Sequence, residues 1–282
     1  MLYSLLHRKT YSRIASLFTA QAGRTLYQTF RLPLVLGLCF FSFQVQATSC
    51  ASSRYDENVI VKRVIDGDTL QLDDGRKLRL IGVNTPERGR NGQTAEPLAN
   101  RAWHLLQALA SPGSALRLRW GKEKKDRYGR LLAHVFNAEN RNLSASLLTA
   151  GMGAAIQIPP NLWAYQCYLH AEQSARKQHR GIWRLAYFAP LEANHLATGV
   201  HGFHFIRGRL SRIGKSKTAL WLNLGKHFAL RIRKKERLYF ANIHFDRLIG
   251  HELTARGWIY AYRGQWRMNL HHPASLEIRT AR

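Results

Sequence analysis

Two polar turns have the residue types that could hold a metal ion between them. The tight turn Asp66-Gly67-Asp68-Thr69 carries two acids, and Asn84-Thr85-Pro86-Glu87 ends the next apolar strand, because Pro86 cannot continue a central ladder. A meander that pairs the strands beside these turns brings Asp68 close to Asn84. Oxygen ligands that meet there suit a hard divalent cation. The simpler alternative is two ordinary polar turns, since Asp-Gly-Asp by itself is common.

Arginines stand beside both turns and in a third segment. Arg79 lies in the apolar strand at residues 78–83, where an unpaired guanidinium is costly to bury, although its stem can pack while its head reaches solvent. In Asp126-Arg127-Tyr128-Gly129-Arg130, the glycine lets the backbone approach a phosphate that the two guanidiniums clamp. A solvated hairpin loop is the alternative for this segment. If the segments meet, they form a phosphate site.

The elements that must position these residues are short strands and helices. Strands are predicted at residues 59–65, 78–83, 115–120 and 131–136, with a further strand of a three-stranded meander between the turns at Asp66-Gly67 and Asp74-Gly75. Apolar spacing predicts helices at residues 94–110, 142–150 and 162–179. Five strands with helices at one end fit a mainly β domain at residues 57–188, built on a five-stranded barrel of the oligonucleotide-binding (OB) type.

A second block follows a predicted linker at residues 189–201. Residues 202–282 contain five strand-like segments and read as another small β-barrel-like domain, with seventeen Lys and Arg against four Asp and Glu. Aromatic residues among these arginines suit base stacking along a basic groove, or simple core packing: Trp221, Trp258, Tyr260, Tyr262 and Trp266. We expect this block to supply affinity for nucleic acid and no chemistry.

The charge of the whole chain points to a polyanionic partner. There are 43 Lys and Arg against 17 Asp and Glu, a formal net charge of +26. Such an imbalance repels itself in a compact state, so a polyanion is a better explanation than solubility alone. Charge does not distinguish nucleic acid from an anionic membrane or an acidic surface polymer.

Residues 1–47 are predicted to be an export signal peptide. The segment has no acid, several basic residues and an apolar run at 32–43 that is too short to span a bilayer. Small residues up to Ala47 favour cleavage there, which leaves a mature N-terminal segment at 48–56. A membrane anchor, an organelle leader and lipoprotein processing at Cys50 are the alternatives. We expect a periplasmic or secreted monomer that is not inserted in a membrane after cleavage.

Two cysteines remain after the predicted cleavage, because Cys39 leaves with the leader. In an oxidising compartment, Cys50 and Cys167 suggest one disulfide between the mature N-terminus and a helix. A buried thiol at Cys167 with an unrelated Cys50 is the alternative.

Taken together, the three polar segments resemble the staphylococcal nuclease (thermonuclease) family. The likeness covers roughly residues 59–183 and includes the Ile65–Thr69 turn, Arg79 with the Val83–Glu87 turn, and the Asp126–Arg130 loop, in the family's order. More weakly, residues 202–282 resemble a basic accessory domain that follows the nuclease domain in some exported bacterial relatives. The resemblance implies an OB-type barrel that hydrolyses phosphodiester bonds of DNA and RNA.

The resemblance also implies roles for individual residues. Arg79 and Arg130 would bind the scissile phosphate, Glu87 would activate the attacking water, and Arg127 and Tyr128 would contact the substrate. Calcium would be held by Asp68, Asn84 and the Thr85 carbonyl, with Asp66 behind them. Because the family usually has aspartate at the Asn84 position, we expect weaker calcium binding or a different divalent ion here.

Two other classes of function remain open from the sequence. A non-catalytic nucleic-acid-binding protein is the main alternative, because related domains exist that have lost their active sites, and Asn84 keeps it open. A basic envelope protein that binds acidic polymers without cleaving them is supported by charge alone.

Overall fold

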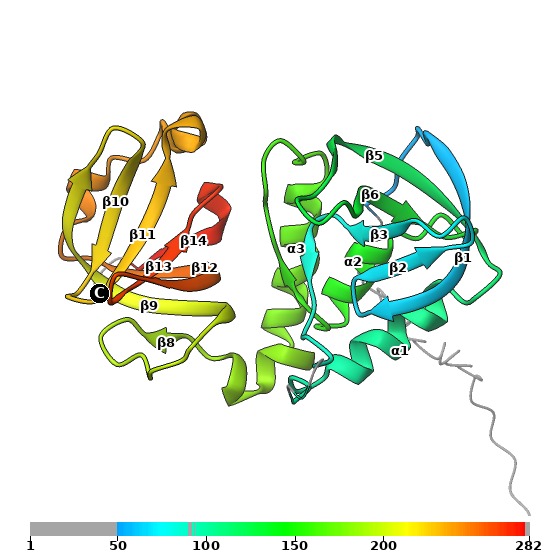
Figure 1. The fold of residues 1–282 in the computed structure, drawn as a ribbon, viewed down its shortest axis with the longest axis horizontal. Coiled ribbons are helices and arrows are strands. Elements are labelled where there is room, and N and C mark those ends of the chain that lie inside the picture. The colour runs from blue at the N-terminus through cyan, green and yellow to red at the C-terminus, as the bar shows by residue number, and fades with distance from the viewer. Residues whose placement is uncertain (1–49, 90–91, 93, 280–282) are drawn as a thin grey trace, which may run out of the picture. The chain divides into compact units, whose positions relative to one another are not determined.

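A closed five-stranded barrel forms the first half of the described chain (Figure 1). The computed structural model describes residues 50–279 except 90, 91 and 93, so the predicted signal peptide lies outside the described residues. The strands pair in the order β1-β2-β3-β6-β5, and β5 returns to β1. Their bounds are β1 Glu57–Asp66, β2 Thr69–Leu72, β3 Lys77–Leu80, β5 Ala115–Lys125 and β6 Leu131–Phe136. The predicted OB-type barrel is therefore confirmed.

The β1 strand shows how the sequence sets the faces of this barrel. Val59 and Val61 point into the core while Ile60 and Lys62 face solvent, as a period of two requires. A register shift between Val61 and Arg63 then turns Val64 inward and leaves Arg63 outside. The core that results is aliphatic, with fully buried leucines from several strands: Leu70, Leu78, Leu116 and Leu118.

Three α-helices among the described residues accompany the barrel: α1 Ala99–Leu109, α2 Leu143–Thr149 and α3 Tyr165–Lys177. Helix α1 starts five residues later than residues 94–110 predict, because Leu98 has a left-handed backbone (φ 69°) directly after Pro97. Asn142 caps α2 by accepting a hydrogen bond from Ala145 N (3.1 Å). Helix α3 also starts later than predicted, at Tyr165.

A two-stranded ribbon beside the barrel carries Asn84. It pairs β4 (Val83–Asn84) with β7 (Ala154–Ala155). Gly82 lies just before β4 with φ +88°, and a Cβ there would lie 2.2 Å from the Tyr168 ring. Glycine therefore allows both the turn and the close packing on α3 that bring β4 into place.

The second half of the described chain forms another closed five-stranded barrel, in the order β9-β10-β11-β13-β12, with β12 returning to β9. Its strands are β9 Gly202–Lys215, β10 Ala219–Leu224, β11 Phe228–Arg233, β12 Glu252–Tyr262 and β13 Gln265–Asn269. Two short strands extend the sheet: β8 Leu191–Glu192, inside the predicted linker, and β14 Leu276–Arg279. The 3₁₀ turns are η1 Gly181–Arg184, η2 Ala186–Phe188, η3 Lys234–Phe240, η4 Phe245–Leu248 and η5 Pro273–Ser275.

Buried ion pairs join the second barrel to α3. Arg256 of β12 contacts Glu172 of α3 (Nη1 to Oε2, 2.6 Å), and both side chains are almost fully buried. Arg256 also donates to the Ala155 carbonyl of β7 (3.3 Å), and Glu172 accepts from Ala155 N (2.5 Å). An outer pair links Arg176 Nη1 to Glu277 Oε1 (2.8 Å). The second barrel is thus attached to the ribbon that carries Asn84.

Two further features concern the covalent link between distant segments and the membrane. Cys50 and Cys167 form a disulfide with a Cα–Cα distance of 5.7 Å, which attaches the segment before β1 to α3. Within residues 50–279, outside the three that are not described, no helix is both long enough and apolar enough to cross a membrane.

Candidate active site

The acidic turn between β1 and β2 packs directly on the Asn84-Thr85 segment. Gly67 is required at the contact, because a Cβ there would lie 2.6 Å from Thr85 Oγ1. Asp68 Oδ2 accepts hydrogen bonds from both Thr85 N and Thr85 Oγ1, each 3.0 Å long. The structure therefore brings together the two turns that sequence analysis expected to meet.

Arg79 lies beneath this contact and is almost fully buried. Its Nη1 donates to the carbonyls of Leu80 (3.0 Å) and Val83 (2.8 Å). Its Nη2 donates to Asn84 Oδ1 (3.1 Å) and contacts Asp68 Oδ2 (3.0 Å). Burial lowers the pKa of Arg79 and the nearby Asp68 carboxylate opposes that shift; a guanidinium stays protonated in proteins. The interior charge is thus paired and held in one orientation.

The loop after β5 presents the second arginine. β5 runs on to Lys125, beyond the predicted end at residue 120, because Asn161 supplies partners for the Glu123 backbone (2.9 Å in each direction). The remaining turn is organised by Asp126, whose Oδ1 accepts from Tyr128 N (2.9 Å) and Arg130 N (3.0 Å). Asp126 Oδ2 also accepts from Arg130 Nε (2.7 Å). Asp126 therefore fixes the direction of the Arg130 guanidinium.

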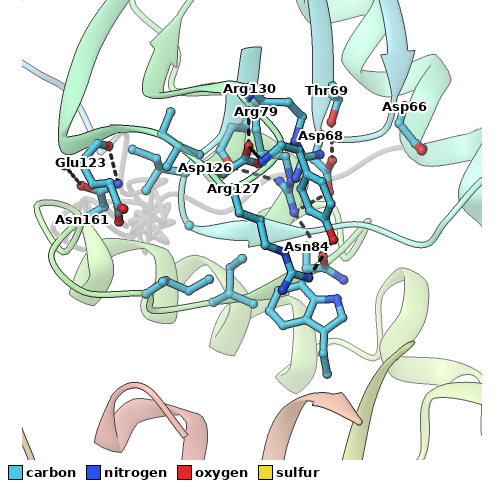
Figure 2. Close-up of a pocket in the computed structure, with 18 of the residues that line it drawn as sticks. Asp66, Asp68, Thr69, Arg79, Asn84, Glu123, Asp126, Arg127, Arg130 and Asn161 are labelled. Atoms are coloured by element: carbon cyan, nitrogen blue, oxygen red, sulfur yellow. Dashed lines mark hydrogen bonds and ion pairs between the residues drawn. The ribbon is translucent and has the colours of Figure 1, made fainter. Parts of the chain in front are cut away.

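These residues line one cavity of about 810 Å³. Figure 2 shows Arg79 and Arg130 near each other, with Asp68 and Asn84 beside the Arg79 guanidinium and Arg127 extending from the same loop as Arg130. The cavity lining also includes Asp66, Glu87 and Tyr128. All predicted catalytic and substrate-contact residues line it, and Thr85 adjoins it through its bonds to Asp68.

Glu87 is a carboxyl group of the cavity whose pKa is shifted strongly by its surroundings. Its backbone N–H donates to Glu96 Oε2 (2.9 Å), which orders the segment just after Pro86. The side chain is exposed to solvent on one side, but the protein around it reduces its hydration. That desolvation, together with the negative charges of Asp68 and Asp66, raises the pKa of Glu87 to about 7. A carboxylate with this pKa can accept a proton near neutral pH.

The oxygen atoms of the cavity have the chemistry that a hard divalent cation takes. Asp66, Asp68 and Asn84 all line the cavity, so they offer two carboxylates and one amide oxygen. Across the described residues, His, Cys, Asp and Glu side chains do not gather in groups of three or more that could enclose a metal ion. Three such oxygens are fewer than the six to eight that a calcium ion takes, so a cation held here would keep several water molecules as ligands.

Two kinds of cavity residue were not assigned a role from the sequence. The first is Asp126, whose place at the start of a tight turn is a recognisable signal, because aspartate often bonds the backbone two residues on. The second is a set on the second barrel: Arg233, Trp258, Asn269 and His271. The sequence names Trp258 as one of five aromatic candidates for base stacking and favours a solvated strand end for His271; of those five, long-range packing brings Trp258 to this cavity.

The fold and this site together define a class of protein: an OB-type barrel whose guanidiniums and carboxylates face one cavity suited to a phosphate. Sequence comparisons agree with that class. The family model described as staphylococcal nuclease homologue matches residues 77–185. The thermonuclease of Staphylococcus intermedius is 35% identical over 130 residues, which cover 45% of this chain and 76% of that protein.

Two further relatives show how far the similarity extends. The thermonuclease of Staphylococcus hyicus is 32% identical over 154 residues, covering 53% of this chain and 90% of that protein. Endonuclease YhcR of Bacillus subtilis (strain 168) is 32% identical over 178 residues, covering 59% of this chain but only 14% of that much longer protein. The chain belongs to the staphylococcal nuclease family.

Proposed function

We propose that this chain is an exported, divalent-metal-dependent nuclease that hydrolyses phosphodiester bonds of DNA and RNA by water attack. It is a hydrolase of phosphodiester bonds, as its family membership indicates. The observation that carries the proposal is the convergence of Arg79, Arg130 and Glu87 on one cavity with Asp68 and Asn84. Because water is the nucleophile, no 2′-hydroxyl is needed, and both nucleic acids serve as substrates.

The two arginines bind the scissile phosphate and stabilise the charge that develops on it. As the water oxygen bonds to phosphorus, negative charge grows on the equatorial phosphate oxygens. Arg79 and Arg130 are already oriented by Asp68 and Asp126, so little reorganisation is needed when that charge appears.

Glu87 acts as the general base. Its carboxylate accepts one proton of the attacking water while the new phosphorus–oxygen bond forms. The bond from phosphorus to the leaving sugar oxygen then breaks, and that oxygen takes up a proton from solvent. The raised pKa of Glu87, about 7, matches a group that must accept and release a proton near neutral pH.

Asp68 and Asn84, with Asp66 and the Thr85 carbonyl nearby, are the residues that would hold the divalent cation. When bound, the ion supplies positive charge beside the phosphate and polarises water. Calcium is the proposed ion from the family, although the single negative charge at Asp68 and the neutral Asn84 favour weaker binding.

Export is proposed from the predicted signal peptide at residues 1–47 and is supported by the Cys50–Cys167 disulfide, because such bonds persist in oxidising compartments. The protein would act in the periplasm or outside the cell. Mass spectrometry of the exported chain tests this: an N-terminus at Thr48 is expected, and an intact leader or a lipid on Cys50 would contradict it.

The test of the proposed activity is incubation of the mature chain with plasmid DNA and with RNA, with calcium or with a chelator. Wild-type protein is expected to cleave both in calcium only. Glu87→Gln is expected to lower turnover by about 100- to 10,000-fold, the contribution of a positioned base. The control is Glu139→Gln, which removes an exposed carboxylate that pairs only with Arg141 (3.5 Å).

Three outcomes separate the candidate functions. Cleavage by Glu87→Gln at the wild-type rate would remove Glu87 from the mechanism. Cleavage in chelator at the same rate as in calcium would contradict metal dependence. Binding of nucleic acid without any cleavage would favour the non-catalytic alternative.

A further inference from the structure

The cavity of the candidate active site has a second wall that belongs to the other barrel. Arg233, Trp258, Asn269 and His271 line it, opposite the residues of the first barrel, and we call these four the second-barrel wall. They come from the end of β11, from β12, from the end of β13 and from the segment after β13. The predicted accessory domain therefore reaches the active-site cavity itself.

Strand geometry explains why Trp258 is placed there. On β12, Arg256 and Trp258 are two residues apart and so point to the same face, while Ala255 and Ile259 point into the barrel core. Arg256 is fixed on Glu172 (2.6 Å) and on the Ala155 carbonyl (3.3 Å). Trp258 lies two residues further along the strand, about 7 Å from Arg256, and its indole is on the same face. The cavity residues Ile156 and Ile158 lie one and three residues after Ala155 in the chain.

The indole of Trp258 is supported on one side and open on the other. Its ring packs edge-on against Phe203 (ring centroids 5.2 Å apart), yet 40% of the residue remains exposed. Exposing a large aromatic surface inside a cavity is unfavourable unless a ligand covers it. Tyr128, 68% exposed, is the aromatic residue of the first barrel that lines the same cavity.

Polar groups of the second-barrel wall suit a phosphate backbone or base edges. Arg233 Nη2 is paired with Glu236 Oε1 (2.5 Å), and His271 Nδ1 lies 2.6 Å from that same oxygen. The Arg233 side chain nevertheless remains 36% exposed and lines the cavity. Asn269 lines the cavity too, and its buried Oδ1 has no hydrogen-bond partner among the described residues.

We propose that the second-barrel wall is a binding subsite for the nucleic-acid strand next to the scissile phosphate, with Trp258 stacking on an unpaired base. The proposal rests on the proposed nuclease function. A base inside a duplex already has both faces covered, so an indole in a walled cavity selects single-stranded or locally opened nucleic acid. Arg233 contacts a neighbouring phosphate. The second barrel thus takes part in substrate selection at the active site.

The experiment compares wild type, Trp258→Ala and Trp258→Phe on single-stranded DNA oligonucleotides of two and twelve nucleotides. Loss of one stacking partner is expected to raise KM for the twelve-mer by about tenfold, with a smaller change in kcat. The rise should be smaller for the dinucleotide, which is too short to reach both the phosphate site and the subsite. Trp258→Phe keeps a ring and should restore most of the affinity. Trp163→Ala is the matched control, an indole with the same exposed fraction of 40% that does not line the cavity.

A binding measurement separates this inference from the proposed activity. Fluorescence anisotropy with a labelled twelve-mer in chelator should show about tenfold weaker binding by Trp258→Ala at unchanged thermal stability. If wild type binds in this Trp258-dependent way but cleaves nothing, the subsite stands and the nuclease proposal fails. If Trp258→Ala matches wild type in both KM and binding, the subsite is overturned and the second barrel is only a support. An equal KM rise for Trp163→Ala would also overturn it.

Discussion

Asn84 is the residue at which this site differs most clearly from the family pattern. In a family site an aspartate stands at this position, whereas here the amide oxygen of Asn84 accepts a hydrogen bond from Arg79 Nη2 (3.1 Å). The amide is thus compatible with the buried guanidinium, but it leaves the oxygens of the proposed metal site with one negative charge fewer. The loss of this charge lowers the expected affinity of the proposed site for a divalent cation.

Asn84→Asp is therefore expected to lower the calcium concentration needed for half-maximal cleavage, because ligand charge helps to set calcium affinity. A calcium titration of activity checks it. Asn161→Asp adds the same charge to another part of the cavity, beside Glu123, and should change the requirement much less. An unchanged requirement in Asn84→Asp would remove this side chain from contact with the ion.

At the scale of residues, the sequence predicted most of the side chains that line the cavity but not the hydrogen bonds that orient them. The Asp68–Thr85 contact followed from the pairing of neighbouring strands, and the structure has it. The four bonds of Arg79 did not follow, because two of them go to carbonyls whose direction depends on the bend after β3. Trp258 and Arg233 lie far away in the sequence, and only packing between barrels brings them to the cavity.

At the scale of elements, hydrophobic periodicity located strands and helices but missed their ends where tertiary contacts decide. Strand β6 has the predicted bounds, residues 131–136. Strand β5 continues through the charged residues 122–125, which no apolar alternation marks, because Asn161 binds its backbone. Short β8 and β14 contain too few residues to show a period and are strands only through their partners β9 and β12.

The contact between β6 and α3 contains a titratable group with a consequence for stability. His134 of β6 is buried, and its Nδ1 lies 2.7 Å from Tyr168 Oη of α3. Burial, helped by the charge of Arg119, lowers the pKa of His134 to about 3. In the unfolded chain this histidine titrates near its ordinary value of 6.5, so the unfolded state binds more protons between pH 6.5 and 3. Stability is therefore lost as pH falls below 6.5.

The loss should approach about 1.4 kcal/mol per pH unit, or about 2 kcal/mol between pH 6.5 and 5. Urea unfolding at pH 7 and at pH 5 measures it. His134→Asn keeps a polar atom near Nδ1 but does not titrate. Its free energy of unfolding should therefore fall by about 2 kcal/mol less than that of wild type between pH 7 and pH 5. His170→Asn, an exposed position on α3, is the control and should behave like wild type. Equal pH dependence in His134→Asn and wild type would contradict a buried neutral imidazole.

At the scale of the whole molecule, the second barrel is attached to α3 through Arg256, a charged side chain that is almost fully buried. Arg256 faces Glu172 at 2.6 Å, and the carboxylate also receives the Ala155 N–H. A pair buried in this way is expensive to desolvate, so it adds less stability than its short distance suggests. Breaking it leaves the buried Glu172 with Arg176 (3.0 Å) as its charged partner. Ribbon β4/β7, which carries Asn84, is held by the same contact.

Arg256→Met should lower the free energy of unfolding by up to about 3–5 kcal/mol, the cost of breaking a buried ion pair, reduced by the Arg176 contact that Glu172 keeps (3.0 Å). Adding Glu172→Gln in the same chain should recover part of that loss, because the charge is then gone. Arg279→Met, which breaks an exposed pair with Glu252 (3.3 Å), should cost less than about 1 kcal/mol. Urea unfolding followed by tryptophan fluorescence gives all three free energies. If Arg256→Met costs no more than Arg279→Met, the buried pair does not stabilise the attachment of the second barrel.

The bond between Cys50 and Cys167 has a further consequence, because its two ends are 117 residues apart. Every residue of the first barrel's site, from Asp66 to Arg130, lies inside the loop that it closes. A protease that cuts an exposed turn such as Arg127-Tyr128 therefore leaves two fragments still covalently joined. On a gel without reductant such nicked protein migrates near the intact chain, and it separates into pieces only after reduction. The fragments also remain at high effective concentration to reassemble, so a single nick need not release the halves of the active site from each other.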